Sequence, residues 1–157
     1  MTDDDALRAD LQALYADLDA RIAAANPRCD ASGRCCRFAE WGHALFLSAP
    51  EAEFLFSEPF SPGGAVSADR CPYQVEGRCE ARERRPTGCR VYFCDPAWQE
   101  KMTEVMEDAV RALHALHERH GRAWDYRPLH RFDPLAAALA QCPLPPAAAS
   151  LTVVKRP

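Results

Sequence analysis

The chain has 157 residues, of which 48% are hydrophobic and 27% are charged, a composition typical of one folded domain with a modest core. Its formal net charge of −4 argues against a molecule built to coat nucleic acid or an anionic membrane. No apolar run approaches the roughly 20 residues that span a bilayer, and the acidic residues 1–5 lack the apolar core of a signal peptide. We therefore expect a cytoplasmic protein with no membrane segment.

Residues 3–25 carry the pattern of an amphipathic helix. Apolar side chains recur at spacings of three and four and form one stripe: Leu7, Leu11, Leu14, Leu18 and Ile22. The three aspartates at residues 3–5 favour the positive end of the helix dipole and are expected to supply a cap. Asn26-Pro27 should end the helix, which we interpret as scaffold.

Short elements are expected after this helix. Residues 44–48 predict a short strand, and Ser48 is placed to cap a short helix over residues 49–56. Residues 57–69 are rich in Pro, Gly and Ser and predict a loop that covers or flanks the cysteines.

Residues 71–79 predict a tight hairpin that turns at Glu76-Gly77. A short helical turn should then end before Pro86, because proline restricts the residue ahead of it. Gly88 is expected to permit a close approach of the chain.

The longest helix is predicted over residues 96–120. Asp95 is its expected cap, Pro96 takes the first position, and Gly121 ends it. Its apolar face is expected to consist of Met102, Val105, Met106, Ala109, Leu113 and Leu116.

The expected fold class is mainly α, in one small domain over residues 1–142. Two long helices flank a loop-rich cysteine region with a short hairpin, residues 134–142 predict a last short helix, and residues 143–157 are expected to be a tail. Such a thin core would gain from a metal that cross-links it.

Seven of the eight cysteines fall within one stretch of the sequence: Cys29, Cys35, Cys36, Cys71, Cys79, Cys89 and Cys94. In a reducing compartment, clustered thiols hold metal more often than they form disulfides. The sequence therefore predicts a metal site formed by a subset of these seven. Cys142 stands far from them and is expected to be a semi-buried thiol without a special role.

The order of these motifs resembles the YkgJ-like cysteine-cluster proteins, a family described as zinc- or iron-chelating. The residues that carry the resemblance are Cys35-Cys36, Cys71-Pro72-Tyr73, Cys79 and Arg85-Pro86-Thr87-Gly88-Cys89-Arg90. They lie within residues 29–94, a little under half of the chain. The resemblance implies metal chelation by the cysteines. Residues 80–82 depart from the family pattern, which has an apolar residue and a tyrosine there, and this affects packing rather than the ligands.

A related branch, the flagellin lysine N-methylases, carries a comparable cysteine cluster. The resemblance therefore offers an alternative function, a cluster-dependent enzyme that modifies a protein partner. The sequence contains no glycine-rich loop between a strand and a helix that would indicate an S-adenosylmethionine site. A structural zinc module for protein interaction is the other alternative, and the sequence does not decide whether the protein is an enzyme.

Thiolates are soft ligands, which narrows the metal to zinc or an iron–sulfur cluster, with copper(I) less favoured. Structural zinc sites usually draw ligands from closely spaced cysteine pairs, and only Cys89 and Cys94 come near that spacing. Seven thiols also exceed what one zinc needs. An iron–sulfur cluster accepts widely spaced ligands, so the spacing slightly favours an iron–sulfur cluster over Zn²⁺.

Positive charge accompanies the cysteines. Residues 70–90 contain six arginines and three glutamates. Arginines beside thiolates lower the proton affinity of the sulfur, and Arg85 and Arg90 belong to the family-like motif, so we expect these two beside the cofactor. The alternative is a solvated basic loop. No aromatic side chains are interleaved with this patch, so it gives no strong nucleic-acid signal.

Histidines are the other candidate ligands. His114, His117 and His120 follow at three-residue spacing near a helix C-terminus, where cations favour the dipole, and only adjacent pairs share a face. His43 is the better candidate for an auxiliary ligand or proton carrier. The sequence identifies no catalytic acid, base or nucleophile and leaves the oligomeric state open.

Overall fold

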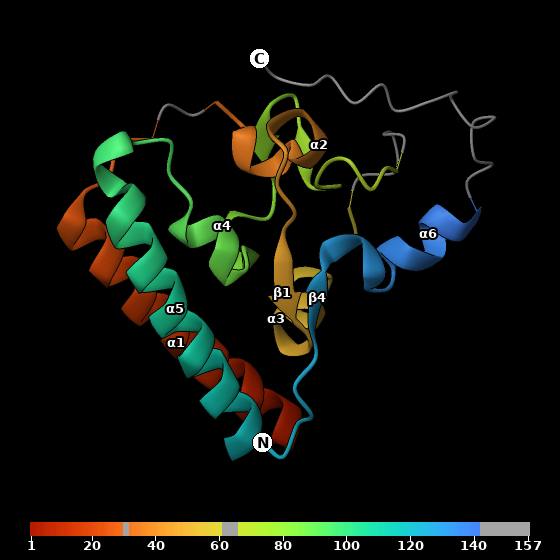
Figure 1. Cartoon of the computed structure of the whole chain (residues 1–157). Helices are drawn as coiled ribbons and strands as arrows, with labels where there is room; N and C mark the ends of the chain where they lie inside the picture. The colour runs from red at the N-terminus through yellow and green to blue at the C-terminus, as the bar shows by residue number, and fades with distance from the viewer. Residues whose placement is uncertain (30–31, 61–65, 142–157) are drawn as a thin grey trace.

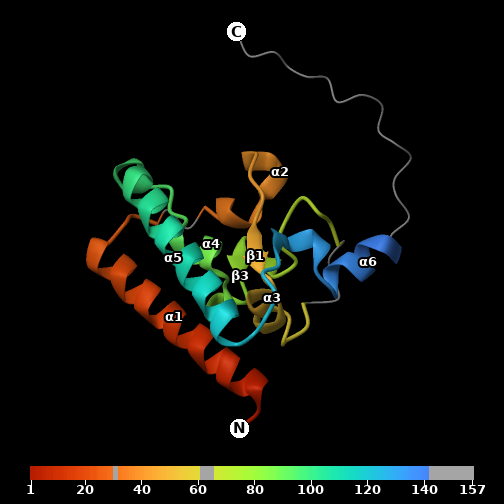
Figure 2. The ribbon, with the colours of Figure 1, turned by 60° about the horizontal axis from the view of Figure 1, so that its bottom comes forward.

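Two long helices, α1 (Asp3–Ala25) and α5 (Gln99–Arg119), lie side by side along one edge of the molecule (Figure 1). This computed structural model describes residues 1–29, 32–60 and 66–141. The remaining elements are short and pack against the inner side of this helix pair, as the turned view also shows (Figure 2). The predicted fold class is confirmed: the protein is a small, mainly helical single domain, and the described residues form two small sheets.

The predicted first helix is confirmed, with two differences in detail. Its cap is Thr2 rather than an aspartate: the Thr2 hydroxyl accepts from the Asp5 backbone N–H at 3.1 Å, and the Asp5 carboxylate accepts from the Thr2 N–H at 3.0 Å. Tyr15 is buried where Leu14 was expected, and Leu14 is half-buried at the edge of the stripe. The Tyr15 ring belongs to the interior because its hydroxyl reaches a buried partner on another helix.

The predicted long helix is confirmed, and its first turn is the 3-10 turn η3 (Pro96–Trp98), which precedes α5. The Asp95 carboxylate caps it by accepting from the Ala97 N–H at 3.0 Å. The buried face of α5 consists of Val105, Ala109, Leu113, Leu116 and His117. Met102 and Met106 are only half-buried, because their part of the helix faces a pocket.

A two-stranded antiparallel sheet joins the segment that follows α5 to a segment from the middle of the chain. The predicted strand is β1 (Phe46–Ser48), and it leads directly into the predicted helix α3 (Ala49–Leu55). Its partner β4 (Tyr126–Pro128) was not predicted, since three residues ending in proline show no alternating pattern. After β4 the chain forms η4 (Leu129–Arg131) and α6 (Leu135–Gln141), the predicted last helix.

The predicted hairpin is confirmed as β2 (Gln74–Val75) paired with β3 (Arg78–Cys79). Glu76 and Gly77 both have positive φ, at 50° and 76°, which is the tight turn that suits a two-residue hairpin loop. The turn η2 (Arg82–Arg84) ends before Pro86, as predicted.

A further short helix, α4 (Thr87–Val91), follows Pro86 and was not predicted. Gly88 within it lies against β1, where an added Cβ would meet Leu45 Cδ1 at 3.0 Å, so the expected close approach at this glycine is present. Two small elements complete the cysteine region: η1 (Arg34–Cys36) and α2 (Phe38–Trp41).

The core divides between the two parts of the molecule. Side chains of α1 and α5 pack together in two clusters that include Phe54 of α3 and Trp98. A third cluster joins β1, α3, the hairpin, α4 and α6 around the cysteines. None of the helices in the described ranges is long and apolar enough to cross a membrane. The central part of the predicted loop over 57–69, Cys142 and the predicted tail lie outside the described residues.

Candidate metal centre

Five of the seven predicted cysteines meet at one place, although they come from four segments. Cys35 and Cys36 lie in η1, Cys71 precedes the hairpin, Cys79 ends it, and Cys89 lies in α4. Cys36, Cys71 and Cys89 are buried in the third core cluster, and Cys35 and Cys79 pack against it. A backbone hydrogen bond of 2.8 Å from Cys71 N–H to the Cys36 carbonyl joins two of these segments directly. We call these residues the five-thiol cluster.

Cys36 lies at the middle of this cluster. Its sulfur is 3.9 Å from the sulfur of Cys35, and the thiols of Cys71 and Cys79 are close enough to influence its pKa. Donation of its proton to Cys35, and then to the other two sulfurs, raises the pKa of Cys36 well above its ordinary value. Cys36 is thus the thiol of this group that most strongly retains its proton.

The acceptors of that proton are the more acidic thiols. The hydrogen bond from Cys36 lowers the pKa of Cys35 to about 7 and that of Cys79 to about 6, and the Arg85 guanidinium acts in the same direction on both. Burial instead raises the pKa of Cys89. The two half-buried thiols, Cys35 and Cys79, are therefore the ones that lose a proton most readily.

The spacing of the doublet resembles that of ligands on a single metal ion. A zinc–sulfur bond of about 2.3 Å in a tetrahedral site separates two ligand sulfurs by about 3.8 Å, and the Cys35 and Cys36 sulfurs are 3.9 Å apart. Over the described ranges of the chain, no three His, Cys, Asp or Glu side chains are arranged to hold a metal ion as they stand. Metal binding at the cluster would therefore require thiol side chains to reorient.

The two predicted arginines take different places. Arg85 is near enough to lower the pKa values of Cys35, Cys79 and Cys89 by its charge. Arg90 has a buried side chain, and its guanidinium donates to Asp19 at 2.6 Å and to the carbonyl oxygens of Glu83 at 2.6 Å and Arg85 at 2.7 Å. Arg90 thus holds the segment that carries Arg85 to α1, and a role for its charge beside a cofactor stays a prediction.

A buried carboxylate holds the helix that carries Cys89. Glu51 is 0% exposed and accepts from the Ser48 N–H at 2.8 Å, the Thr87 N–H at 2.8 Å, the Thr87 hydroxyl at 2.6 Å and the Tyr15 hydroxyl at 3.2 Å. It therefore ties α1 and α3 to the first residue of α4. The sequence analysis missed Glu51. The Ser48-x-x-Glu51 spacing is a capping-box signal for the bond to Ser48, but no local signal points to Thr87.

The other two predicted cysteines lie at the edge of the site. Cys29 is exposed. The Cys94 sulfur lies 3.7 Å from the Ser32 hydroxyl and beside Tyr92, whose pKa is raised first by burial and then by the Cys94 charge. The structure therefore divides the predicted set into five converging thiols and two peripheral ones.

His43 stands next to the five-thiol cluster. Its Nε2 lies 3.4 Å from the Cys35 carbonyl, and its ring stacks on Tyr92 with centroids 5.5 Å apart. In contrast, the helix histidines lie at the C-terminal end of α5, where His117 Nδ1 is 2.9 Å from the Ala123 carbonyl and His120 Nε2 is 2.8 Å from Asp10. Their contacts join α5 to the following loop and to α1.

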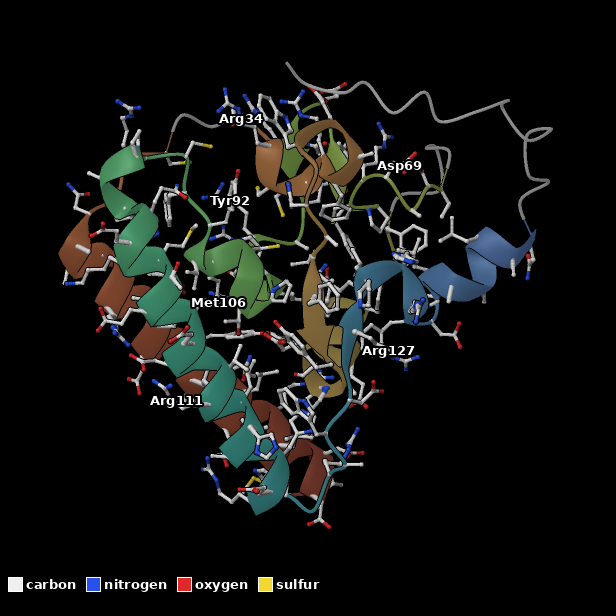
Figure 3. All side chains as sticks on the ribbon, in the orientation of Figure 1. Arg34, Asp69, Tyr92, Met106, Arg111 and Arg127 are labelled. Atoms are coloured by element: carbon white, nitrogen blue, oxygen red, sulfur yellow. The ribbon has the colours of Figure 1, made fainter. Side chains whose placement is uncertain are left out.

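Two arginines, Arg34 and Arg37, lie in or next to η1. Figure 3 labels Arg34 there, and its guanidinium lies over the Trp41 ring at 4.1 Å from the centroid. Arg37 pairs with Glu40 at 3.0 Å. The charges of these two arginines are thus engaged in local contacts.

Comparisons of the chain with protein-family models, with curated proteins and with solved structures found no match. The case for the site therefore depends on the residues themselves and on their placement in this fold.

Proposed function

We propose that this protein binds a thiolate-ligated metal centre through the five-thiol cluster. The observation that carries the proposal is the position of Cys36, whose thiol lies beside that of its neighbour Cys35 and interacts with two further thiols, Cys71 and Cys79, from other segments. A soft metal cation binds where several thiols converge, because it displaces their protons and is held by the resulting thiolates. The charge of Arg85 would partly balance the thiolates that remain.

Zinc is our first candidate for the metal. The 3.9 Å separation of the Cys35 and Cys36 sulfurs supports two ligands on one ion, whereas the sulfurs that hold a four-iron cluster stand further apart around a larger cage. This reverses the slight preference for iron–sulfur that spacing along the sequence gave. Cys35, Cys36, Cys71 and Cys79 would supply four ligands, with Cys89 as a fifth thiol beside them.

The test is purification without oxygen, followed by elemental analysis and an absorption spectrum. We expect close to one zinc per chain and a colourless protein, because zinc has no redox or d–d absorption. A brown protein that contains iron and inorganic sulfide would replace zinc with an iron–sulfur cluster at the same cysteines. A well-folded chain that takes up neither metal, even after exposure of the reduced protein to each, would overturn the proposal.

A further inference from the structure

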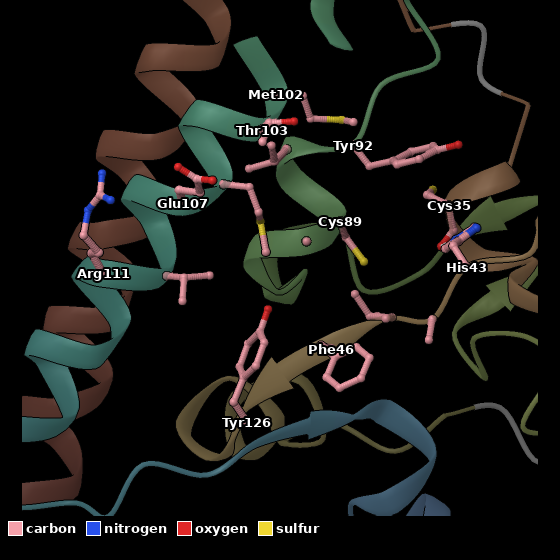
Figure 4. Close-up of a pocket in the computed structure, with 16 residues that line it drawn as sticks. Cys35, His43, Phe46, Cys89, Tyr92, Met102, Thr103, Glu107, Arg111 and Tyr126 are labelled. Atoms are coloured by element: carbon pink, nitrogen blue, oxygen red, sulfur yellow. The ribbon is translucent and has the colours of Figure 1, made fainter. Parts of the chain in front are cut away.

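A pocket with a volume of about 720 Å³ opens between α5 and the segment that leads into β1 (Figure 4). This volume is within the range of small-molecule binding sites. Cys35 and Cys89 of the five-thiol cluster form part of its wall, and its other described lining residues lie outside the candidate metal centre. A ligand in the pocket therefore needs no contact with a metal.

Methionines and aromatic rings form two sides of the pocket. Met102 and Met106 come from α5, whereas Phe46 and Tyr126 come from the sheet of β1 and β4 (Figure 4). The Phe46 and Tyr126 rings are neighbours, with centroids 5.8 Å apart and planes inclined by 31°. Thioether sulfurs make favourable contacts with aromatic rings, and aromatic rings pack well on one another. An aromatic ring is therefore the ligand body that suits the space between the methionines and Phe46.

One polar group inside the pocket lacks a protein partner. The Tyr126 hydroxyl points into the pocket (Figure 4), and none of the described residues forms a hydrogen bond with it. Burial, and then the charge of Glu51, raises the pKa of Tyr126 to about 12, so the hydroxyl keeps its proton at neutral pH. A half-buried O–H group gains free energy from an acceptor. The ligand should therefore carry a hydrogen-bond acceptor next to its ring.

The charged lining residues argue against an ionic ligand. Of the described residues that line the pocket, Arg111 is the single arginine or lysine, and its guanidinium pairs with Asp108. An anionic group would lose its hydration in the pocket without a free cation to replace it. An ammonium group could pair with the exposed Glu107 on the same helix, but it cannot accept from the Tyr126 hydroxyl. The acceptor group should therefore be neutral, as a carbonyl oxygen is.

We propose that this pocket binds a small, uncharged aromatic carbonyl compound, such as an aryl ketone. The ring of the ligand lies between Phe46 and the methionines of α5, and its carbonyl oxygen accepts from the Tyr126 hydroxyl. The ligand binds reversibly, and no covalent bond forms or breaks. This site is additional to the five-thiol cluster and does not depend on the proposed function.

The methionines provide the measurement. The chain contains three: Met102 and Met106, which line the pocket, and Met1, which is exposed at the N-terminus. Full-length protein labelled with ¹³C at the methionine methyl groups is titrated with propiophenone and followed by NMR. We expect saturable shifts of the Met102 and Met106 methyl signals, because the ring of the probe lies against them, and no shift of the Met1 signal. Propylbenzene, which has the same ring without the carbonyl oxygen, is the matched probe and should bind more weakly.

Substitution of Tyr126 tests the hydrogen bond. Tyr126→Phe removes the hydroxyl and keeps the ring that packs beside Phe46. It should weaken the binding of propiophenone about threefold to tenfold, the value of one neutral hydrogen bond. The affinity for propylbenzene should not change, because propylbenzene has no acceptor.

Substitutions on α5 test the location. Thr103→Trp fills the pocket from an exposed position of its lining, where a new side chain disturbs the core least, and should weaken both probes. Lys101→Trp is the matched control, since Lys101 is exposed on the same helix outside the lining. This control variant should bind both probes as the unmodified protein does.

Three results would each overturn the inference: methionine signals that do not respond to propiophenone, an equal affinity of Tyr126→Phe and the unmodified protein for propiophenone, or equal binding by Thr103→Trp and Lys101→Trp. None of these measurements uses the metal content of the protein. Their failure would therefore leave the proposed function of the five-thiol cluster intact.

Discussion

The helix pair and the cysteine region are stabilised by different kinds of interaction. α1 and α5 are 23 and 21 residues long, and each buries a continuous apolar stripe against the other. The elements of the cysteine region, from η1 to α4, are strands of two or three residues and helices of three to seven residues. Elements that short are not stable alone, because each costs more chain entropy than its own hydrogen bonds return. The cysteine region therefore depends on contacts between distant segments, and the thiols and Glu51 provide them.

Substitution of Cys36, the central thiol, should reveal the difference between the cysteine region and the helix pair most clearly. In Cys36→Ser we expect the metal content to fall from near one per chain to near zero, because a serine hydroxyl is a poor ligand for a soft metal. The midpoint of thermal unfolding should fall by roughly 10 °C or more, since metal-binding free energy contributes to folding free energy. Elemental analysis and circular dichroism measure the two effects. Hydrogen exchange should rise over residues 66–91 before it rises in α1 and α5.

Cys29→Ser is the control for that substitution, because Cys29 is exposed at the edge of the site. This variant should have the same metal content and the same midpoint of thermal unfolding as the unmodified protein. If Cys29→Ser and Cys36→Ser behave alike, the five-thiol cluster is not the ligand set.

A substitution that leaves a cavity in the helix pair should lower the stability and leave the metal content unchanged. Leu113 is 0% exposed in the cluster between α1 and α5, so Leu113→Ala should lower the free energy of unfolding by about 2–5 kcal/mol in urea titrations. The metal content should not change, because Leu113 packs in a different core cluster from the five thiols. Leu14→Ala, at a half-buried position of α1, should cost clearly less. Loss of metal in Leu113→Ala would show that the two regions are not independent.

Glu51 tests the connection between the regions. Glu51→Gln exchanges one carboxylate oxygen for an NH₂ group, which cannot accept from Ser48 or Thr87. We expect a loss of about 1–3 kcal/mol in the free energy of unfolding, together with weaker metal binding, because α4 carries Cys89. Chelator competition measures the second effect. Glu104→Gln, at an exposed position on α5, is the matched control, and equal behaviour of the two variants would contradict the positioning role of Glu51.

The affinity of the five-thiol cluster for metal should fall gradually as the pH is lowered. Cys35 and Cys79, with pKa values of about 7 and about 6, must be thiolates to bind metal. As pH falls from 8 to 5.5 through these values, protons compete for both sulfurs, and the metal affinity should fall by up to about tenfold per pH unit for each proton displaced. The affinity should thus rise with pH across this range in chelator titrations. An affinity that does not change with pH would mean that these two sulfurs are not ligands.

Local signals predicted the elements whose formation depends on neighbouring residues. The apolar stripes at spacings of three and four coincide with the two long helices. The first helix ends at Asn26-Pro27, the second begins at Asp95-Pro96, and the hairpin turns at Glu76-Gly77. Local signals failed where a distant partner makes the choice. β4 exists because β1 pairs with it, and Tyr15 rather than Leu14 is buried because Glu51 accepts from its hydroxyl.

The sequence by itself determined the two long helices, the hairpin and the concentration of thiols in one stretch, because these depend on periodicity, turn chemistry and composition. Only the tertiary structure decided which thiols meet. Cys79 joins the five-thiol cluster and Cys94 does not, since hairpin pairing and the docking of α4 on Glu51 set the directions of these segments. The pocket is likewise a product of the fold, because its wall combines residues from η1, β1, α4, α5 and β4 that no spacing along the chain connects.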